Sequence, residues 1–195
     1  MKEFVISKLR ESAELKLVFA KEATNDVVKA AEIIEKSIKS SGKILIFGNG
    51  GSAADSQHIA AEFVNRYLKV RDALPAIALT TDTSILTSIG NDSSFENIFS
   101  RQIEALGKKG DVAWGLSTSG RSKNIIKALR TAKSLGLKTI GFTGRDAGEI
   151  EKIVDCNINV PSRSTPRIQE VHITIGHIIC ELIEDKLSKK RAVSI

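Results

Sequence analysis

The chain has 195 residues, of which 42% are hydrophobic and 27% charged, and its formal net charge is +6. This composition excludes a disordered chain, and the length suits one globular domain with a helical extension. No apolar run reaches the ~18 residues of a membrane span, and the N-terminal segment lacks the apolar core of a signal peptide. We therefore expect a cytoplasmic protein with no membrane partner.

Few residues suit nucleic-acid binding or disulfide chemistry. One Trp and one Tyr supply little surface for stacking on bases, so we expect no nucleic-acid partner. The two cysteines, Cys156 and Cys180, form no Cys-x-x-Cys pair and are interpreted as buried, reduced thiols. The basic residues near the end of the chain, Lys189, Lys190 and Arg191, are interpreted as a solvated helix terminus.

Hydrophobic periodicity predicts two helices over 3–39 that join near residues 23–25. We expect residues 1–40 to pack on the domain or on a neighbouring subunit. Residues 41–195 then alternate between short apolar strands and helices and are expected to form one globular unit. The predicted strands cover 43–47, 76–81, 111–117, 138–143 and 157–160. The helices that follow them cover 52–67, 84–89, 96–106, 122–135 and 167–189.

Strands that alternate with helices indicate an α/β fold with a parallel sheet covered on both faces. Five such strands predict a doubly wound, flavodoxin-like sheet of order 2-1-3-4-5, preceded by the N-terminal helical extension. In that order the first and third strands are neighbours, and the winding reverses between them. Ligands bind such sheets beyond the carboxyl ends of the strands at this switch point.

Polar, glycine-rich loops follow the first and third predicted strands. They read GNGGSAAD over 48–55 and STSGRSKN over 117–124, and each opens a helix. Helix N-termini offer free N–H groups to an anion, and glycines let a ligand approach the backbone. The hydroxyl donors are Ser52, Ser117, Thr118, Ser119 and Ser122. Two adjacent loops of this kind predict a phosphate site, although either loop alone could be a turn with a helix cap.

The first loop also matches the dinucleotide fingerprint at Gly48, Gly50 and Ala53. That motif needs an acidic residue about 20 residues further on. Here Asp82 is the first one at the end of the second strand, which is too far along the chain. A dinucleotide site is therefore disfavoured, and a P-loop is excluded because no Gly-Lys-Ser/Thr follows the glycines.

Acid–base and metal candidates lie on two helices. His58 and Glu62 are spaced i and i+4 and so share one face, where they could bind a divalent metal, transfer protons or form a solvated surface pair. The last helix carries His172 and His177, which differ by about 140° around the axis and cannot share one face. The spacing leaves open which of the two is structural.

Asn91 and Asp92 follow a short predicted helix in the segment GNDSSFE. One interpretation is a turn that caps a helix, because these residue types are common there. The other is recognition of sugar hydroxyls. The residues alone do not distinguish the two.

Four segments, in the same order, resemble the phosphoheptose isomerase branch of the sugar isomerase (SIS) domain family. They read FGNGGSAADSQHIAAEF, PAIALTTDTSILTSIGND, FSRQIEALGKKGDVAWGLSTSGRS and STPRIQEVHITIGHIICELIE. The likeness covers residues from about 40 to 186. It implies a cytoplasmic homotetramer with active sites at subunit interfaces, which isomerises sedoheptulose 7-phosphate to D-glycero-D-manno-heptose 7-phosphate, the first step of heptose biosynthesis for lipopolysaccharide or capsule.

The resemblance also implies roles for individual residues. Glu62 and His177 are the acid–base pair. One zinc ion per subunit is bound by His58, Glu62, Gln169 and His177. The phosphate is held by Ser52, Ser117, Thr118, Ser119 and Ser122. The remaining substrate contacts are Asn49, Gly50, Gly51, Glu62, Asn91, Asp92 and Gln169. His172 is left as a packing residue.

The helix spacing adds a hypothesis about the zinc ligands. Gln169 and His177 are eight residues apart, which is about 12 Å along one helix. We therefore expect the two ligands of one ion to come from different chains. The stretch before Gln169 also departs from the family pattern, because residues 162–166 read SRSTP where acidic residues are frequent.

A second function is compatible with the loops. Non-catalytic SIS-domain proteins of the type that associates with a replication initiator resemble this chain there. That branch lacks the acidic and imidazole residues at positions 62 and 177, so Glu62 and His177 favour the enzyme.

Overall fold

The computed structural model describes residues 1–188, and the basic residues 189–191 lie outside them. Its core is a parallel sheet of order β2-β1-β3-β4-β5, which confirms the predicted doubly wound order. The strands are β1 (Ile44–Gly48), β2 (Ala76–Ala78), β3 (Val112–Ser117), β4 (Lys138–Gly144) and β5 (Cys156–Val160). The winding therefore reverses between β1 and β3.

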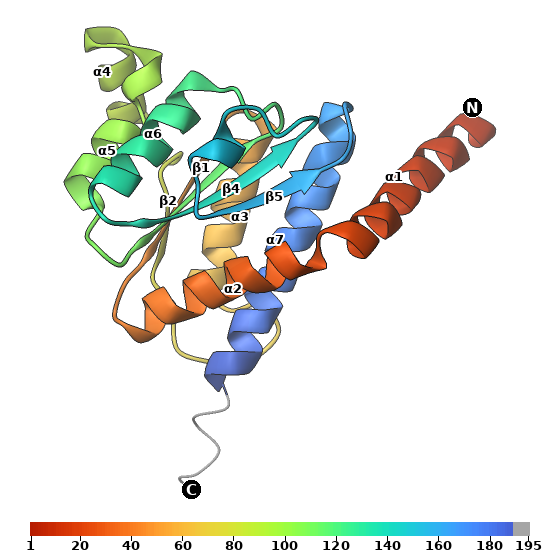
Figure 1. The fold of residues 1–195 in the computed structure, drawn as a ribbon, viewed down its shortest axis with the longest axis horizontal. Coiled ribbons are helices and arrows are strands. Elements are labelled where there is room, and N and C mark those ends of the chain that lie inside the picture. The colour runs from red at the N-terminus through yellow and green to blue at the C-terminus, as the bar shows by residue number, and fades with distance from the viewer. Residues whose placement is uncertain (189–195) are drawn as a thin grey trace, which may run out of the picture.

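Helices cover both faces of this sheet (Figure 1). One layer contains α2 (Thr24–Lys39), α3 (Gly51–Val64) and α7 (Thr165–Ser188). The other layer contains α5 (Ser100–Leu106), α6 (Lys123–Ser134) and the short 3-10 helices η1 (Phe95–Asn97) and η2 (Ile150–Lys152), with α4 (Thr83–Asp92) beyond it. Within residues 1–188, no helix is both long and apolar enough for a membrane span.

Strands β1 and β3 are almost entirely apolar, as is typical of parallel strands that are buried on both faces. Ile44 and Ile46 of β1 point into the layer of α2, α3 and α7, whereas Leu45 and Phe47 point into the other layer. Trp114 of β3 is completely buried in the first layer, and its ring lies 4.9 Å from that of Phe142. The sheet therefore lies between two separate hydrophobic clusters, one on each face.

The N-terminal segment forms two helices that break at Ala23, as the periodicity predicts. The second helix, α2, buries Ala30, Ala31 and Ile34 in the core next to β5 and α7. The first, α1 (Lys2–Glu22), projects from the body of the molecule as an arm (Figure 1) and buries only Phe19 among its residues.

Four elements differ from the prediction by three or more residues. Helix α5 begins at Ser100 rather than residue 96, because residues 95–97 form the 3-10 helix η1. Helix α3 ends at Val64 rather than residue 67, because the Arg71 side chain donates hydrogen bonds to the carbonyl groups of its last turn. Strand β2 ends at Ala78 rather than residue 81. Helix α4 begins after Asp82, whose side chain accepts a hydrogen bond from the Ile85 amide at 2.8 Å, and runs to residue 92.

His172 fills an interior position where α7 crosses β4. The side chain is completely buried, its Nε2 lies 2.9 Å from the carbonyl oxygen of Thr143, and its ring lies 5.3 Å from that of Phe142. Burial lowers the pKa of His172 to about 4, so the imidazole is neutral at neutral pH. This residue packs the core, which leaves His177 as the histidine of α7 that is available for chemistry.

Folding stability should depend on this histidine below neutral pH. In the unfolded chain His172 takes up a proton near its ordinary pKa of 6.5, whereas in the folded protein it does so only near pH 4. Its contribution to the free energy of unfolding is therefore complete above pH 6.5 and declines as the pH falls to 4. Between pH 6.5 and pH 4, the free energy of unfolding should decrease by on the order of 1–3 kcal/mol less in the His172→Gln variant than in the native protein. Denaturant titrations at several pH values measure this, and parallel curves for the two proteins would contradict it.

Candidate active site

The loops that follow β1 and β3 lie side by side at the switch point. Gly48 pairs with Leu116 at the end of the two strands. Beyond them, the Asn49 and Asn124 amides exchange two hydrogen bonds, of 2.9 and 2.8 Å. This reciprocal pair joins the first turn of α6 to the loop before α3. The two N-termini therefore face the same carboxyl edge of the sheet.

The first loop leads directly into α3. Gly50 precedes the helix in a left-handed conformation, with φ +56°. Ser52 is 97% buried at the start of α3, and its carbonyl accepts a 2.7 Å hydrogen bond from the Ser56 hydroxyl. The N–H groups of Ser52, Ala53 and Ala54 donate to the carbonyl oxygens of Asn49 and Gly50, so it is the positive end of the helix dipole that suits this helix end to an anion.

The second loop brings several hydroxyl groups together. The Ser117 hydroxyl, at the end of β3, lies 3.0 Å from that of Ser122, which precedes α6. Thr118 and Ser119 are half-buried between them. Gly120 turns the chain with φ +63°, and a Cβ there would lie 1.9 Å from the carbonyl oxygen of Ala147. The loop is thus held against the segment after β4, with its hydroxyl groups near the start of α6.

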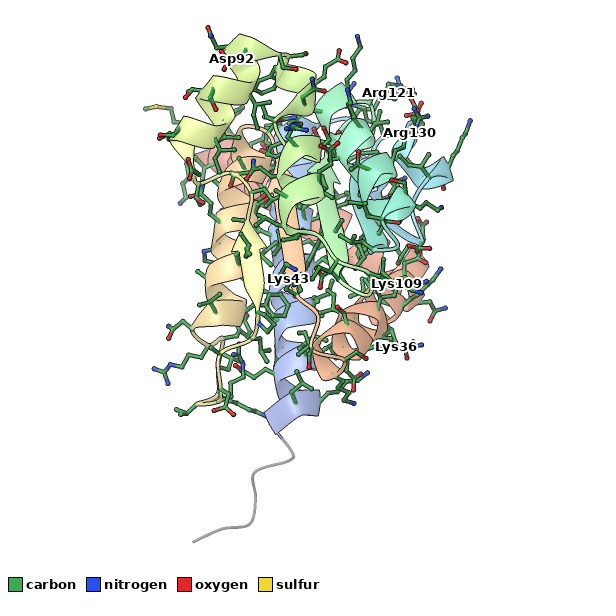
Figure 2. All side chains as sticks on the ribbon, turned by 90° about the vertical axis from the view of Figure 1, so that its left-hand side faces the viewer. Lys36, Lys43, Asp92, Lys109, Arg121 and Arg130 are labelled. Carbon is green, nitrogen blue, oxygen red and sulfur yellow. The ribbon has the colours of Figure 1, made fainter. Side chains whose placement is uncertain are left out.

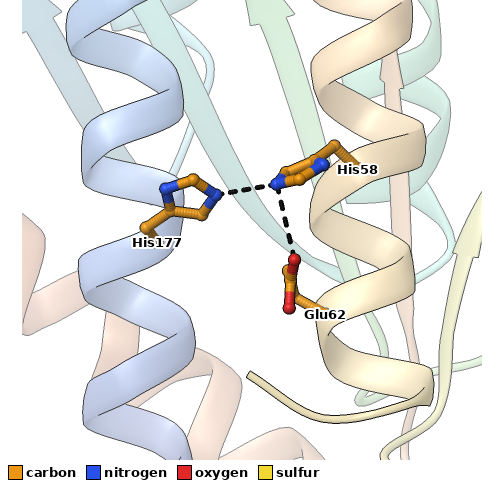
Figure 3. Close-up of side chains that lie close together, drawn as sticks. All are labelled: His58, Glu62 and His177. Carbon is orange, nitrogen blue, oxygen red and sulfur yellow. Dashed lines mark hydrogen bonds and ion pairs between the residues drawn. The ribbon is translucent and has the colours of Figure 1, made fainter. Parts of the chain in front are cut away.

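A cluster of two imidazoles and a carboxylate lies further along α3 (Figure 3). The Nε2 atoms of His58 and His177 are 2.8 Å apart, and His58 Nε2 lies 3.4 Å from a carboxylate oxygen of Glu62. The two imidazole rings meet edge to face, with centroids 5.0 Å apart. The structure therefore brings together three of the four residues that the family resemblance assigns to zinc.

The surroundings of this cluster favour uncharged imidazole at His177. Burial lowers the pKa of His177, and the neighbouring His58 lowers it further, while Glu62 opposes this effect. One turn further along α7, burial raises the pKa of the Cys180 thiol to about 12. A neutral imidazole beside a carboxylate can accept a proton or ligate a metal, and the buried thiol stays protonated.

The donor atoms of this cluster fit a small divalent cation. Among the described residues, His58, Glu62 and His177 form the group whose ligand atoms all lie within 4.8 Å of one another. Nitrogen and oxygen ligands about 2.0–2.2 Å from a tetrahedral zinc ion lie roughly 3.4 Å apart. The His58–Glu62 distance of 3.4 Å agrees, and the imidazoles at 2.8 Å would have to separate by about half an ångström.

Gln169 lies apart from this cluster within the chain. Its side-chain amide packs over Gly51, because a Cβ on that glycine would lie 2.6 Å from Gln169 Nε2. His58 is seven residues further along α3, about 10 Å along its axis. The amide therefore lies beside the N-terminal end of α3, and His177 lies beside the middle of this helix.

Asn91 and Asp92 occupy a position different from the predicted one. They form the last two residues of α4 instead of following it, because the helix continues beyond residue 89. Both are exposed, and Asn91 donates a 2.8 Å hydrogen bond to Asp92. Asp92 lies at the same end of the molecule as Arg121, while Lys43 and Lys109 lie nearer the opposite end (Figure 2). The pair is thus outside the imidazole cluster but on the carboxyl side of the sheet.

Three residues near the site were missed by the sequence analysis. Asn124 stands within the second loop, but nothing in its type indicates the pairing with Asn49. Asp55 has a buried carboxylate oxygen without a partner among the described residues, and burial raises its pKa. The Tyr67 ring stacks on His177 with centroids 5.4 Å apart. Only the i, i+3 spacing of Asp55 and His58 could have been recognised beforehand.

Comparison with known proteins gives a consistent match. Residues 9–144 match the family model of the SIS domain. The phosphoheptose isomerase of Aquifex aeolicus is 54% identical over 190 residues, which cover 97% of this chain and 100% of that relative. A solved phosphoheptose isomerase from Neisseria gonorrhoeae has 44% identity and a TM-score of 0.90, covering 94% of this chain and 98% of that one. The enzyme structure from Francisella tularensis has 33% identity and the same TM-score, with 94% and 97% covered.

The shape of the second loop can be tested at Gly120. Alanine there must adopt a left-handed conformation and displace the Ala147 carbonyl, since its Cβ would lie 1.9 Å from that oxygen. Gly110 is a matched control, because it also has a positive φ, +93°, but nothing lies within 4 Å of its Cβ position. We expect Gly110→Ala to lower the free energy of unfolding by about 1–2 kcal/mol, and Gly120→Ala to lower it clearly more. Equal losses in denaturant unfolding would show that the contact with Ala147 is unimportant.

Proposed function

This chain belongs to the SIS domain family, and from its relatives of 54% and 52% identity we propose that it is a phosphoheptose isomerase, which converts sedoheptulose 7-phosphate to D-glycero-D-manno-heptose 7-phosphate. The observation that carries the proposal is the convergence of His58, Glu62 and His177. Relatives that bear this enzyme name match the chain over nearly its whole length and theirs.

The proposed reaction moves a proton between two neighbouring carbons through an enediol. Glu62 accepts the proton from C1 of the ketose and returns it to C2. His177 removes the proton from the C1 hydroxyl and delivers it to the oxygen on C2, so atoms and charge balance. Burial favours an uncharged His177 imidazole, which can accept the proton of the C1 hydroxyl.

The phosphate of the substrate occupies the paired loops in this proposal. The hydroxyl groups that hold it are Ser52, Ser117, Thr118, Ser119 and Ser122, supported by the N-termini of α3 and α6. Other contacts to the sugar come from Asn49, Gly50, Gly51, Asn91, Asp92 and Gln169. Anchoring of the phosphate leaves the carbonyl end of the sugar free to meet the acid–base pair.

One zinc ion per subunit is the proposed cofactor, with His58, Glu62, Gln169 and His177 as its ligands. When bound, zinc polarises the carbonyl and stabilises negative charge on the oxygen. A carboxylate bound to a cation is a weaker base, so Glu62 acts as a base best through an oxygen that is free. The nitrogen and oxygen donors and the distances within the cluster support this assignment.

We further propose a homotetramer in which residues 41–195 form the SIS domain and residues 1–40 pack on it and on a neighbour. Large apolar side chains of α1 are exposed, among them Phe4, Leu9 and Leu17. An apolar groove of about 290 Å³ lies between α1, α2 and α7. Apolar surface of this kind is typical of subunit interfaces. Because Gln169 lies at the start of α3 and His177 beside its middle, we infer that these ligands of one ion come from different chains.

The non-catalytic alternative is not favoured. Both residues that the initiator-associating branch lacks, Glu62 and His177, are present, and they lie in one cluster. The relatives of high identity carry the enzyme's name. We accordingly propose a cytoplasmic enzyme without nucleic-acid or membrane partners, acting first in heptose biosynthesis for lipopolysaccharide or capsule.

The native protein should convert sedoheptulose 7-phosphate into an aldose phosphate, which NMR can follow directly. We expect Glu62→Gln and His177→Ala each to lower kcat by roughly 10²–10⁴-fold, because each removes a proton-transfer group. The chelator-treated enzyme should lose activity and recover it with zinc. His172→Gln serves as the control, since it alters a histidine of the same helix that lies outside the cluster. No turnover with zinc present would overturn the proposed function.

The shared zinc site predicts complementation between two inactive variants. Gln169→Ala and His177→Ala proteins should each be inactive, and unfolding and reassembly of a mixture should restore part of the activity. Restoration is expected because some mixed tetramers combine an intact Gln169 with an intact His177 across one interface. A mixture of Glu62→Gln and His177→Ala is the matched control and should stay less active, since these residues come from the same chain. Equal recovery in both mixtures would contradict the shared site.

A further inference from the structure

We propose that Tyr67 is a positioning residue for His177, and that the buried pair of Arg71 and Glu184 holds Tyr67 in place. This inference rests on the proposed function and deepens it, because it adds a residue that orients the acid–base histidine. The segment concerned is the loop 65–74, which follows α3 and lies against α7.

The Glu184 carboxylate binds this loop through three successive backbone amides. The N–H groups of Tyr67, Leu68 and Lys69 donate to its two oxygens at 3.0, 2.7 and 2.7 Å. The Glu184 side chain is only 1% exposed. Burial tends to raise the pKa of Glu184, but the amide donors and Arg71 together lower it below its usual value, so the carboxylate is charged. Three amides on one buried anion fix the backbone of the loop at Tyr67.

The Arg71 guanidinium joins the same carboxylate to the end of α3. Its Nε donates to Glu184 at 3.1 Å, and its two Nη atoms donate to the carbonyl oxygens of Glu62 and Phe63 at 2.7 and 2.9 Å. These carbonyls belong to the last turn of α3, which has no further intrahelical partners. The arginine thus links the backbone of Glu62 to α7 and to the loop that carries Tyr67.

The loop places the Tyr67 ring against His177. The two rings are stacked, with centroids 5.4 Å apart and an interplanar angle of 25°. His58 meets another side of the same imidazole edge to face. Rotation of an imidazole about χ2 is only weakly restricted by its own covalent geometry. A ring held on its face therefore limits the directions in which the His177 nitrogens can point.

The positions along α7 explain why a distant ion pair can affect this contact. Glu184 lies seven residues, or two turns, beyond His177, so the two side chains project from the same face of the helix. Tyr67 is anchored by Glu184 through its backbone and touches His177 with its ring. Tyr67 consequently bridges the two turns of α7 that separate Glu184 from His177.

The test compares Tyr67→Leu with Tyr67→Phe in the full-length protein, with kcat and KM measured separately. We expect Tyr67→Leu to lower kcat about tenfold or more with KM nearly unchanged, since a small misplacement of a catalytic group affects rate more than binding. Tyr67→Phe keeps the ring and should stay close to native. Glu184→Gln loses the charge that anchors the loop and should lower kcat in the same direction, which provides a second variant if Tyr67→Leu folds poorly.

NMR of ¹³C-labelled histidine gives a readout that does not depend on turnover. The chain has three histidines, so the His177 signals can be assigned with single variants. Protons stacked on the Tyr67 ring should be shifted upfield in the native protein and in Tyr67→Phe, and this shift should disappear in Tyr67→Leu. Unchanged His177 signals in Tyr67→Leu, or an unchanged kcat, would overturn the proposal. If the native protein has no turnover, the proposed function fails, and the ring shift alone decides whether Tyr67 orients His177.

Discussion

The packing of α3 against α7 is the contact on which the candidate site depends. At Gly176 the two helices approach so closely that a Cβ would lie 2.8 Å from the Ile59 side chain. His177 is the next residue, and His58 precedes Ile59, so this approach brings their imidazoles within 2.8 Å. A side chain at position 176 would require the Ile59 side chain to move aside or the two helices to separate.

The interface between α3 and α7 contains different groups at its two ends. At the start of α3 the Gln169 amide lies over Gly51, beside the positive end of the helix dipole. At the other end the Glu184 carboxylate and Arg71 tie α7 to the last turn of α3. The proposed anion site, the proposed acid–base pair and the structural contacts of Arg71 and Glu184 thus follow one another along a single pair of helices. A parallel sheet makes this arrangement possible, because α3 begins at the carboxyl edge of β1 and must run back along the sheet.

The sheet order and the two polar loops could be predicted because they depend on local patterns: apolar runs, helical periodicity and glycine-rich turns. The i, i+4 spacing likewise identified His58 and Glu62. The end of α3 could not be predicted, since it depends on Arg71 and on Glu184, which is 113 residues further along the chain than Arg71. The partner of Asn49 and the ring that stacks on His177 also arise from tertiary contacts. The choice between His172 and His177 needed the burial of one of them, although the spacing had already placed them on different faces.

The burial of Trp114 determines what optical measurements on this protein can detect. It is the only Trp in the chain, and it lies in the central strand against Phe142. Its fluorescence therefore reports the polarity at one interior point, and a red shift of emission marks the entry of water into the layer beneath α2, α3 and α7. Detachment of the α1 arm or fraying of α4 would leave that signal unchanged. Unfolding curves recorded by Trp fluorescence consequently follow the sheet alone, and far-ultraviolet circular dichroism is needed beside them to detect helices that unfold earlier.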